Sequence, residues 1–250
     1  MSDSERPLLG GRVTAGVVRV GDTVRRPMSI DRSQVHELLR HLERVGFAAA
    51  PRFLGVDAQN REILSFLPGD VPPDLGHYDD AVLHSAATLL RGFHDATASF
   101  PAVPSAFAEV MCHNDWGPPN AVFRHGLPVG IIDYDTVKPG LRLWDIGYSA
   151  ASWLDLGDDA YTGEQQIHRL RVFADGYGRA DYSVATIAAF CLARRTALSV
   201  AGRARGMSDL TDWAEASARW IVENVTEKLL PTGMMPTGQR VDGETAGYPA

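Results

Sequence analysis

Alternating apolar and polar residues in the first seventy positions predict short strands, and one stretch between them has helical spacing. The pair Gly21-Asp22 separates two strand-like runs as a tight turn, and Pro27 ends the second run because proline has no amide hydrogen for a ladder. Ser33 precedes apolar residues that recur every three or four positions, so we expect it to cap a helix. The strands are predicted at 13–20, 23–26, 52–56 and 62–67, and the helix at 33–45.

After a segment rich in proline and glycine at 68–73, the pattern becomes helical. Apolar residues at helical spacing predict helices at 82–93, 146–156, 164–177, 184–200 and 210–229. In the last of these, the stripe expected to face inward contains Trp213, Ala216 and Trp220. The pattern therefore predicts an α+β fold with a small β-rich lobe at 8–67 that contains one helix, a hinge and linker at 68–77, a larger helical lobe at 78–230 and a flexible tail at 231–250.

Composition limits the classes of protein that fit. The chain has 250 residues, 45% of them apolar, which suits one domain or two closely joined lobes. The formal net charge of −7 leaves no basic stripe for phosphate backbones, so we expect no nucleic-acid partner. No apolar run approaches the roughly 20 residues that span a bilayer, so we expect no membrane partner. Two cysteines, Cys112 and Cys191, and a polar N-terminal segment predict a cytoplasmic protein.

The candidate chemistry lies between His113 and Asp133. His113, Asp115 and Asn120 form the pattern H-x-D-x4-N, and after a turn-rich connector the apolar run 129–132 ends at Asp133. Such a loop presents a carboxylate to a hydroxyl group and an amide oxygen to a metal ion, and the strand returns a second carboxylate to that metal. Mg²⁺ takes few oxygens from the protein, because phosphates and water complete its shell. The spacing therefore indicates phosphoryl transfer.

This segment resembles the catalytic core of the aminoglycoside phosphotransferase (APH) family, small-molecule kinases related to protein kinases. The resemblance is carried by Gly117-Pro118-Pro119-Asn120 in the loop, by Ile132-Asp133-Tyr134-Asp135, and by the closely following Leu143-Trp144-Asp145-Ile146-Gly147-Tyr148. It extends over most of the chain, from about residue 8 to about residue 230, and implies a protein-kinase-like fold of two lobes. It also implies an enzyme that moves the γ-phosphate of ATP or GTP to a hydroxyl of a small molecule with Mg²⁺, with an aminoglycoside-like antibiotic among the candidate acceptors.

On this resemblance Asp115 is the catalytic base, and Asn120 and Asp133 are the metal ligands. His113 is expected to be neutral and structural, holding the loop through hydrogen bonds. Asp145 is expected to cap the helix that begins at 146 and to bond back to the catalytic loop.

The phosphate-binding part of the site is predicted in the first lobe. Gly10, Gly11 and Thr14 are expected to bring backbone amides to the phosphates, although the segment is not G-x-G-x-x-G. Where related kinases have a lysine on the next strand, this chain has Arg25 and Arg26, which strand alternation sends to opposite faces. We prefer Arg25 as the phosphate-binding cation.

Two further features belong to the nucleotide side. The helical acid that pairs with the strand cation in related kinases has no clear counterpart, since Glu37 is the only acid near that position. Backbone groups of Ser65, Phe66 and Leu67 are expected to bind the edge of the nucleotide base, which the resemblance alone implies.

The acceptor side is open to more than one interpretation. Asp135 could reach a second metal or a substrate ammonium group. An acidic group that would attract an aminated sugar, or that is only a solvated loop, contains Asp155, Asp158, Asp159 and Glu164. An opposing basic group contains Arg194, Arg195, Arg203 and Arg205.

Two alternative functions remain at the level of sequence. The first is a kinase of another small metabolite, such as an amino-alcohol, a sugar or an amino acid, because a fold does not fix its substrate. The second is a pseudokinase or nucleotide-binding regulator, which the missing lysine and helical acid favour. In each case the expected partners are a nucleoside triphosphate and a small molecule.

Overall fold

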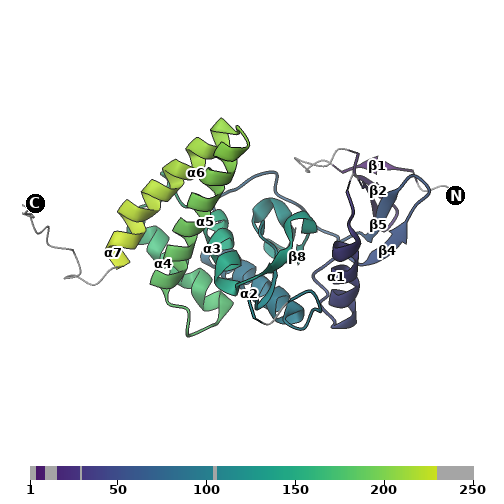
Figure 1. The fold of residues 1–250 in the computed structure, drawn as a ribbon, viewed down its shortest axis with the longest axis horizontal. Coiled ribbons are helices and arrows are strands. Elements are labelled where there is room, and N and C mark those ends of the chain that lie inside the picture. The colour runs from purple at the N-terminus through teal and green to yellow at the C-terminus, as the bar shows by residue number, and fades with distance from the viewer. Residues whose placement is uncertain (1–3, 9–15, 29, 104–105, 230–250) are drawn as a thin grey trace, which may run out of the picture.

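A small sheet lies at one end of an elongated molecule and a group of helices fills the other end (Figure 1). This computed structural model describes residues 4–8, 16–28, 30–103 and 106–229. The predicted α+β architecture is confirmed, with the antiparallel sheet in the N-terminal part and the long helices after it.

The sheet has five strands, each antiparallel to its neighbours, in the order β1-β2-β3-β5-β4. On β3 and β5, Arg26 lies directly opposite Glu62, so a cation and an acid from strands far apart in the sequence are neighbours. The strands are β1 (Arg6–Pro7), β2 (Val18–Val20), β3 (Thr23–Pro27), β4 (Phe53–Val56) and β5 (Arg61–Ser65). The first part of the predicted strand at 13–20 falls outside the described residues.

The one helix of this lobe, α1 (Ser33–Arg44), buries the apolar face that its periodicity predicts, including Leu38, Leu39 and Leu42. The predicted cap is wrong. The N-cap position belongs to Arg32, which makes no side-chain cap, while the hydroxyl of Ser33 bonds to Asp31. Arg32 instead forms an ion pair with Glu62, so its side chain does not cap the helix.

Five long helices form the larger lobe: α2 (Asp80–Thr97), α3 (Arg142–Trp153), α4 (Gly163–Tyr177), α5 (Val184–Ala204) and α6 (Ser208–Ile221). The chain leaves α6 through a π turn, Val222–Thr226, and ends its described part in α7 (Glu227–Leu229). Two short antiparallel ladders lie between α2 and α3. They pair β6 (Val110–Cys112) with β9 (Lys138–Gly140), and β7 (Ala121–Arg124) with β8 (Leu127–Ile131).

The predicted inward stripe of the last long helix is right for Trp220, which packs against the core, and wrong for Trp213 and Ala216, which are exposed. Trp213 is 39% exposed, and α6 instead buries the small face Thr211, Ala214, Ser217 and Ile221. A Cβ placed on Gly202 of α5 would lie 2.7 Å from the hydroxyl of Thr211, so α5 and α6 approach too closely for tryptophan between them. Small residues fill this contact, and Trp213 lies at its border over the guanidinium of Arg195.

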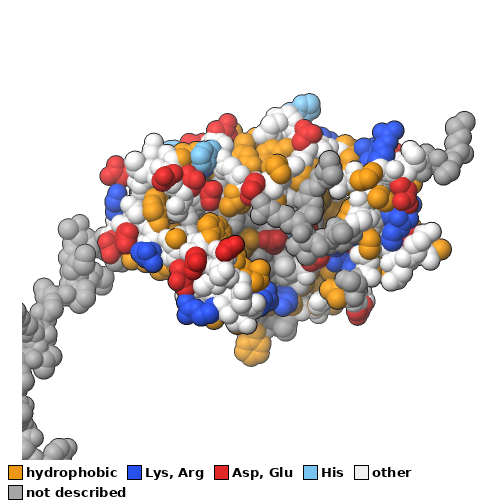
Figure 2. All heavy atoms as spheres, turned by 90° about the horizontal axis from the view of Figure 1, so that it is seen from above, with side chains coloured by type: hydrophobic (Ala, Val, Ile, Leu, Met, Phe, Trp, Pro, Cys, Tyr) orange, Lys and Arg blue, Asp and Glu red, His pale blue; other side chains and the backbone are white. Residues whose placement is uncertain are grey.

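In the described part of the chain, α5 is the one helix long and apolar enough to cross a membrane by length and composition. This differs from the expectation that no segment approaches that length. A single such helix is a weak indication, because core helices pass the same test, and α5 packs against α3 and α6. Acidic and basic side chains are mixed over the described atoms of the face seen in Figure 2.

Candidate active site

The loop after β6 presents Asp115 with both carboxylate oxygens engaged. Asn120, at the end of the turn η1 (Pro118–Asn120), donates its amide to Asp115 Oδ2 at 2.9 Å and to the Asp115 carbonyl at 2.8 Å. Tyr148 of α3 donates its hydroxyl to Asp115 Oδ1. Burial, and the Asp115 carboxylate beside it, raise the pKa of Tyr148, so its proton stays in this hydrogen bond. The carboxylate is therefore fixed in orientation from two sides.

Asp145 of α3 binds the backbone of the loop that carries Asp115. It is fully buried and accepts the backbone amides of His113 at 2.6 Å and Asn114 at 2.7 Å, and it also bonds to His94 Nε2 at 3.0 Å. Burial opposes its charge, yet the contact with His94 and the amides hold its pKa below the ordinary value. The predicted bond back to the loop is present. The predicted cap is not, because α3 begins at Arg142 and Asp145 lies inside its first turn.

His113 is structural in its contacts, as expected. Its Nε2 bonds to the carbonyl of Ile132 at 3.1 Å, which ties the loop to the end of β8, while its buried Nδ1 has no partner among the described residues. Burial is the main cause that lowers its pKa, so the ring is neutral and donates from Nε2. The two predicted motifs are thereby joined through one imidazole.

Asp133 follows β8 in a left-handed backbone conformation, with φ at 61°. Burial and the neighbouring Asp135 carboxylate raise the pKa of Asp133 to about 6. The strand does not continue to Asp135, which lies in the turn η2 (Tyr134–Thr136) and pairs with Arg26 and Arg32. These two cations offset the burial of Asp135 and lower its pKa.

The structure brings Arg26, and not the preferred Arg25, beside Asp133 and Asp135. Arg26 Nη2 lies 3.4 Å from Asp133 Oδ1, and Arg26 Nη1 lies 2.7 Å from Asp135 Oδ1. Arg25 is on the opposite face, where Nη1 donates to Thr23 at 2.5 Å and Nε lies 3.9 Å from Asp57. The prediction that the two arginines face opposite ways is confirmed. The sequence held a signal for the choice, because Arg26 shares its strand face with the apolar Val24.

The acid that accompanies Arg26 is Glu62 on β5, which sequence reasoning missed. It has no exposed surface and contacts three basic side chains. Arg26 lies at 3.3 Å, and Arg32 at 3.1 Å and His36 at 3.0 Å both contact Oε2. On α1, the residue that contacts this site is therefore His36, and not the neighbouring acid Glu37. The available signal in the sequence was an acid, Glu62, at the start of a strand that continues with the apolar residues Ile63 and Leu64.

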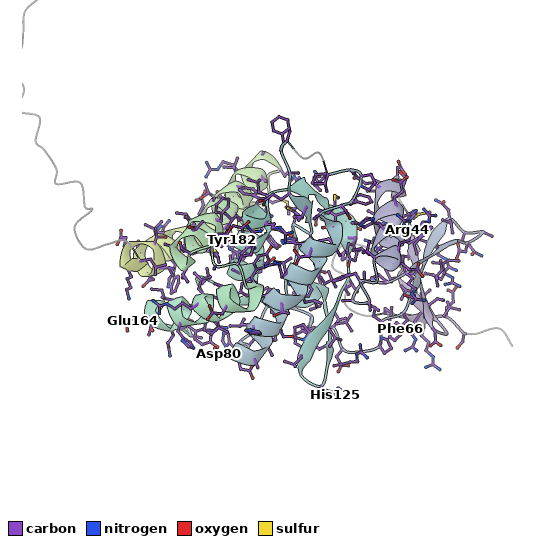
Figure 3. The ribbon with its side chains drawn as sticks, turned by 90° about the horizontal axis from the view of Figure 1, so that it is seen from below. Arg44, Phe66, Asp80, His125, Glu164 and Tyr182 are labelled. Atoms are coloured by element: carbon purple, nitrogen blue, oxygen red, sulfur yellow. The ribbon has the colours of Figure 1, made fainter. Side chains whose placement is uncertain are left out.

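The other predicted nucleotide-binding residues give a mixed result. Gly10, Gly11 and Thr14 lie outside the described residues. The backbone amide of Ser65 donates to the Arg52 carbonyl, and that of Phe66 donates to the Asp22 carbonyl, both at 2.9 Å. These two amides are therefore used within the protein. Phe66 and Arg44 lie at the sheet end of the molecule in Figure 3.

A cavity of about 360 Å³ lies beside the predicted hinge. Ser65 and Leu67 line it together with the end of α1 and the segment that follows, through residues Glu43, Gly46, Phe47, Ala48, Ala50, Pro51 and Arg52. None of these residues comes from β2, β3 or the segment 113–135. The cavity wall contacts β8, because the backbone amide of Ile131 donates at 2.8 Å to the carbonyl of Ala49, which lies between two lining residues.

The donor set fits a Mg²⁺ ion. The amide nitrogen of Asn120 is committed to Asp115, which leaves Asn120 Oδ1 as the atom that can face a metal. Burial, and then the nearby Asp135 carboxylate, raise the pKa of Asp133, and a bound cation would favour its charged form. Among the described residues, no three His, Cys, Asp or Glu side chains are grouped to hold a metal. The two oxygen donors, from Asn120 and Asp133, are enough for Mg²⁺, because phosphates and water complete its coordination shell.

Members of the predicted acidic group have separate partners. Asp158 accepts a bond from His77 at 3.2 Å, and its charge acts on Asp155. Glu164 is in the first turn of α4 and lies 4.0 Å from Lys228. In Figure 3 Glu164 lies near Asp80 at the outer side of the helical lobe.

The two-lobed fold and the loop that carries Asp115, Asn120 and Asp133 define a kinase-like phosphotransferase of small molecules. The profile of the phosphotransferase enzyme family (APH) matches residues 33–186. The chain belongs to this family.

Known proteins agree with this assignment. The trifolitoxin immunity protein of Rhizobium leguminosarum bv. trifolii is 38% identical over 193 residues, which cover 68% of this chain and 72% of that protein. The structure of choline kinase from Cryptosporidium parvum has a TM-score of 0.62 at 12% identity and covers 88% of each chain. The GDP complex of aminoglycoside 2′-phosphotransferase-IIIa has a TM-score of 0.57 at 14% identity, covering 90% of this chain and 94% of that one. At these identities the two structures show the fold alone.

Proposed function

We propose that the protein transfers the γ-phosphate of ATP or GTP to a hydroxyl group of a small molecule. The observation that carries the proposal is the environment of Asp115. Asn120 and Tyr148 each hold one of its carboxylate oxygens, and Asn120 keeps its own Oδ1 for a metal shared with Asp133. Positioning of this kind supplies most of the rate in phosphoryl transfer, because the transition state needs orientation and charge stabilisation.

Each residue has a separate task in this proposal. Asp115 orients the acceptor hydroxyl and takes its proton as the oxygen attacks phosphorus. Asn120 Oδ1 and Asp133 hold Mg²⁺, which neutralises charge on the phosphates when it is bound. Arg26 replaces the strand lysine, and the buried Glu62 orients it. The contacts of Arg26 with Asp133 and Asp135 support this role.

The choice of nucleotide and acceptor also belongs to the proposal. A GDP complex of a related fold supports a nucleoside triphosphate as donor, and the similarity to choline kinase keeps amino-alcohols among the acceptors beside aminoglycosides. We propose a cytoplasmic location, which the two free, buried cysteines support. The hinge at 68–77 remains our proposed boundary between the lobes.

Asp115→Asn tests the function directly. The variant keeps the side-chain shape and can still accept one of the two bonds that Asn120 and Tyr148 donate, but it loses the proton-accepting carboxylate, so phosphate transfer should fall by about 10²–10⁴-fold. The measurement is Mg²⁺-dependent release of ADP or GDP in a screen of aminoglycosides, amino-alcohols and sugars. Thermal unfolding of the variant controls for folding. Turnover close to wild type would place the base elsewhere, and a wild type that binds nucleotide without turnover would favour the pseudokinase.

A second candidate function comes from the 38% identity to the trifolitoxin immunity protein. In this role the protein would protect a bacterium from a toxin, with phosphorylation of a toxin hydroxyl as the chemical means. The test is survival of a trifolitoxin-sensitive strain that expresses either the wild type or Asp115→Asn. Protection by the wild type alone would indicate that immunity depends on phosphate transfer. Equal protection by both proteins would indicate immunity through binding.

A further inference from the structure

The side of α5 next to the catalytic loop carries two adjacent arginines that the proposed mechanism does not use. Arg194 donates to the side chain of Asn114 at 3.4 Å and to its carbonyl at 3.2 Å, and its guanidinium lies 4.9 Å from the ring centre of Tyr148. Asn114 directly precedes Asp115, and the hydroxyl of Tyr148 donates a hydrogen bond to Asp115. Arg194 therefore borders the proposed base.

Both arginines carry charge that no contacting acid neutralises. Among the described residues, their hydrogen bonds go to amide and carbonyl oxygens only, and the buried Nε of each has no partner. Arg195 is 1% exposed, donates to the Ala151 carbonyl at 2.9 Å and stacks on Trp213. Burial lowers the pKa of both guanidinium groups. Buried cations without a contacting anion are costly, so a ligand that brings an anion is favoured here.

The nearest acids are engaged elsewhere. Asp115 accepts bonds from Asn120 and Tyr148, and Asp145 accepts the loop amides and a bond from His94. Their charges act on Arg194 through space but do not form an ion pair with it among the described residues. Neither acid is therefore a direct partner of Arg194 in the part of the chain that the structure describes.

The geometry also separates this region from the phosphates. Asp115 Oδ2 faces Asn120 and the metal side, where Asp133 and Arg26 meet. Asp115 Oδ1 faces Tyr148, and Arg194 lies over that same ring. In-line transfer puts donor and acceptor on opposite sides of the transferred phosphoryl group, so Arg194 lies on the acceptor side.

We infer that the acceptor is a hydroxyl compound that also carries a carboxylate or phosphate group, and that Arg194 binds this anionic group. Arg195, the next residue of α5, adds a second positive charge close to this anionic group. The inference rests on the proposed phosphoryl transfer, and it sets the acceptor apart from cationic alcohols. The anion and the acceptor hydroxyl would lie on one molecule, with the hydroxyl at Asp115 and the anion at α5.

The test is a titration of the full chain, saturated with Mg²⁺ and a non-hydrolysable ATP analogue, with inorganic phosphate and in parallel with acetate. NMR signals of the arginine Nε–H groups report binding, and the two probes separate a phosphate group from a carboxylate group. We expect saturable shifts at Arg194 in the wild type. Arg194→Gln should raise the dissociation constant of the bound anion at least tenfold, and Arg194→Lys, which keeps the charge, should recover part of the affinity.

Arg203→Gln is the matched control, because Arg203 is on the same helix, is exposed and pairs with Glu215. It should leave anion binding unchanged. The inference is overturned if neither anion gives a saturable shift, or if Arg194→Gln binds as tightly as the wild type. Competition between phosphate and the nucleotide analogue would also overturn it, by assigning Arg194 to the nucleotide phosphates. If the analogue fails to bind while phosphate still binds at Arg194, the proposed function fails and the anion site stands.

Discussion

At the scale of single residues, the alternation of side chains along β3 decides which arginine lies beside Asp133. Arg26 shares its face with Val24 and reaches Asp133, whereas Arg25 lies with Asp57 on the other face. Arg26→Ala should raise the dissociation constant of the Mg²⁺-nucleotide complex roughly tenfold or more, as expected for a charge-assisted contact of about 1.5–3 kcal/mol. Arg25→Ala is the matched control and should change it little. Calorimetric titration measures both, and a larger loss in Arg25→Ala would contradict the placement of the two side chains.

Glu62 is the second residue with a role larger than its sequence context suggests. It lies without exposed surface among Arg26, Arg32 and His36. Glu62→Gln keeps the volume but leaves the basic groups without their buried anion, so unfolding free energy should fall by about 3–5 kcal/mol. Chemical denaturation provides the measurement. A loss below about 1 kcal/mol would mean that Asp135 alone neutralises the arginines.

At the scale of elements, the catalytic loop depends on α3 beneath it. Asp145 accepts two loop amides, and its pKa is held below the ordinary value, so it favours the folded state when ionised. That stability is fully present above the ordinary carboxylate pKa of about 4 and is lost as pH falls toward the depressed folded pKa. The difference in unfolding free energy between wild type and Asp145→Asn should therefore be largest above about pH 5.

Denaturant unfolding at a series of pH values checks this expectation. The difference between the two proteins should shrink as pH falls below about 4. Asp181→Asn is a suitable control, because Asp181 pairs with Arg179 on the surface, away from the loop. A difference that stayed constant down to pH 2 would show that the side chain acts through its shape and not through its charge.

At the scale of the whole molecule, the site exists only where the two lobes meet. Arg26 comes from the sheet, and Asp133 comes from the segment after β8 in the larger lobe. Burial and Asp135 raise the pKa of Asp133 to about 6, so the protonated form competes with metal below that pH. Mg²⁺-dependent nucleotide binding should weaken as pH falls below about 6, and Asp133→Asn should abolish both the metal dependence and this pH dependence. Calorimetry at several Mg²⁺ concentrations is the measurement, and an unchanged metal affinity in Asp133→Asn would make this acid structural.

Helix positions were largely predictable because helical periodicity is local. The predicted range 164–177 agrees with α4 within one residue, and the range 184–200 agrees with α5 at its start. Where packing between helices decides orientation, prediction failed. The face of α6 was misassigned because tryptophan is usually buried, whereas the close approach of Gly202 to Thr211 requires small residues there.

The sequence by itself determined the phosphotransferase class, because Asp115, Asn120 and Asp133 belong to one short stretch with the spacing that this chemistry requires. Tertiary structure decided what joins that stretch from afar. The partnership of Arg26 with Glu62 depends on the pairing of β3 with β5, and the position of Arg194 depends on how α5 packs on α3. Such contacts arise from register and packing between distant segments, which local patterns along the chain do not encode.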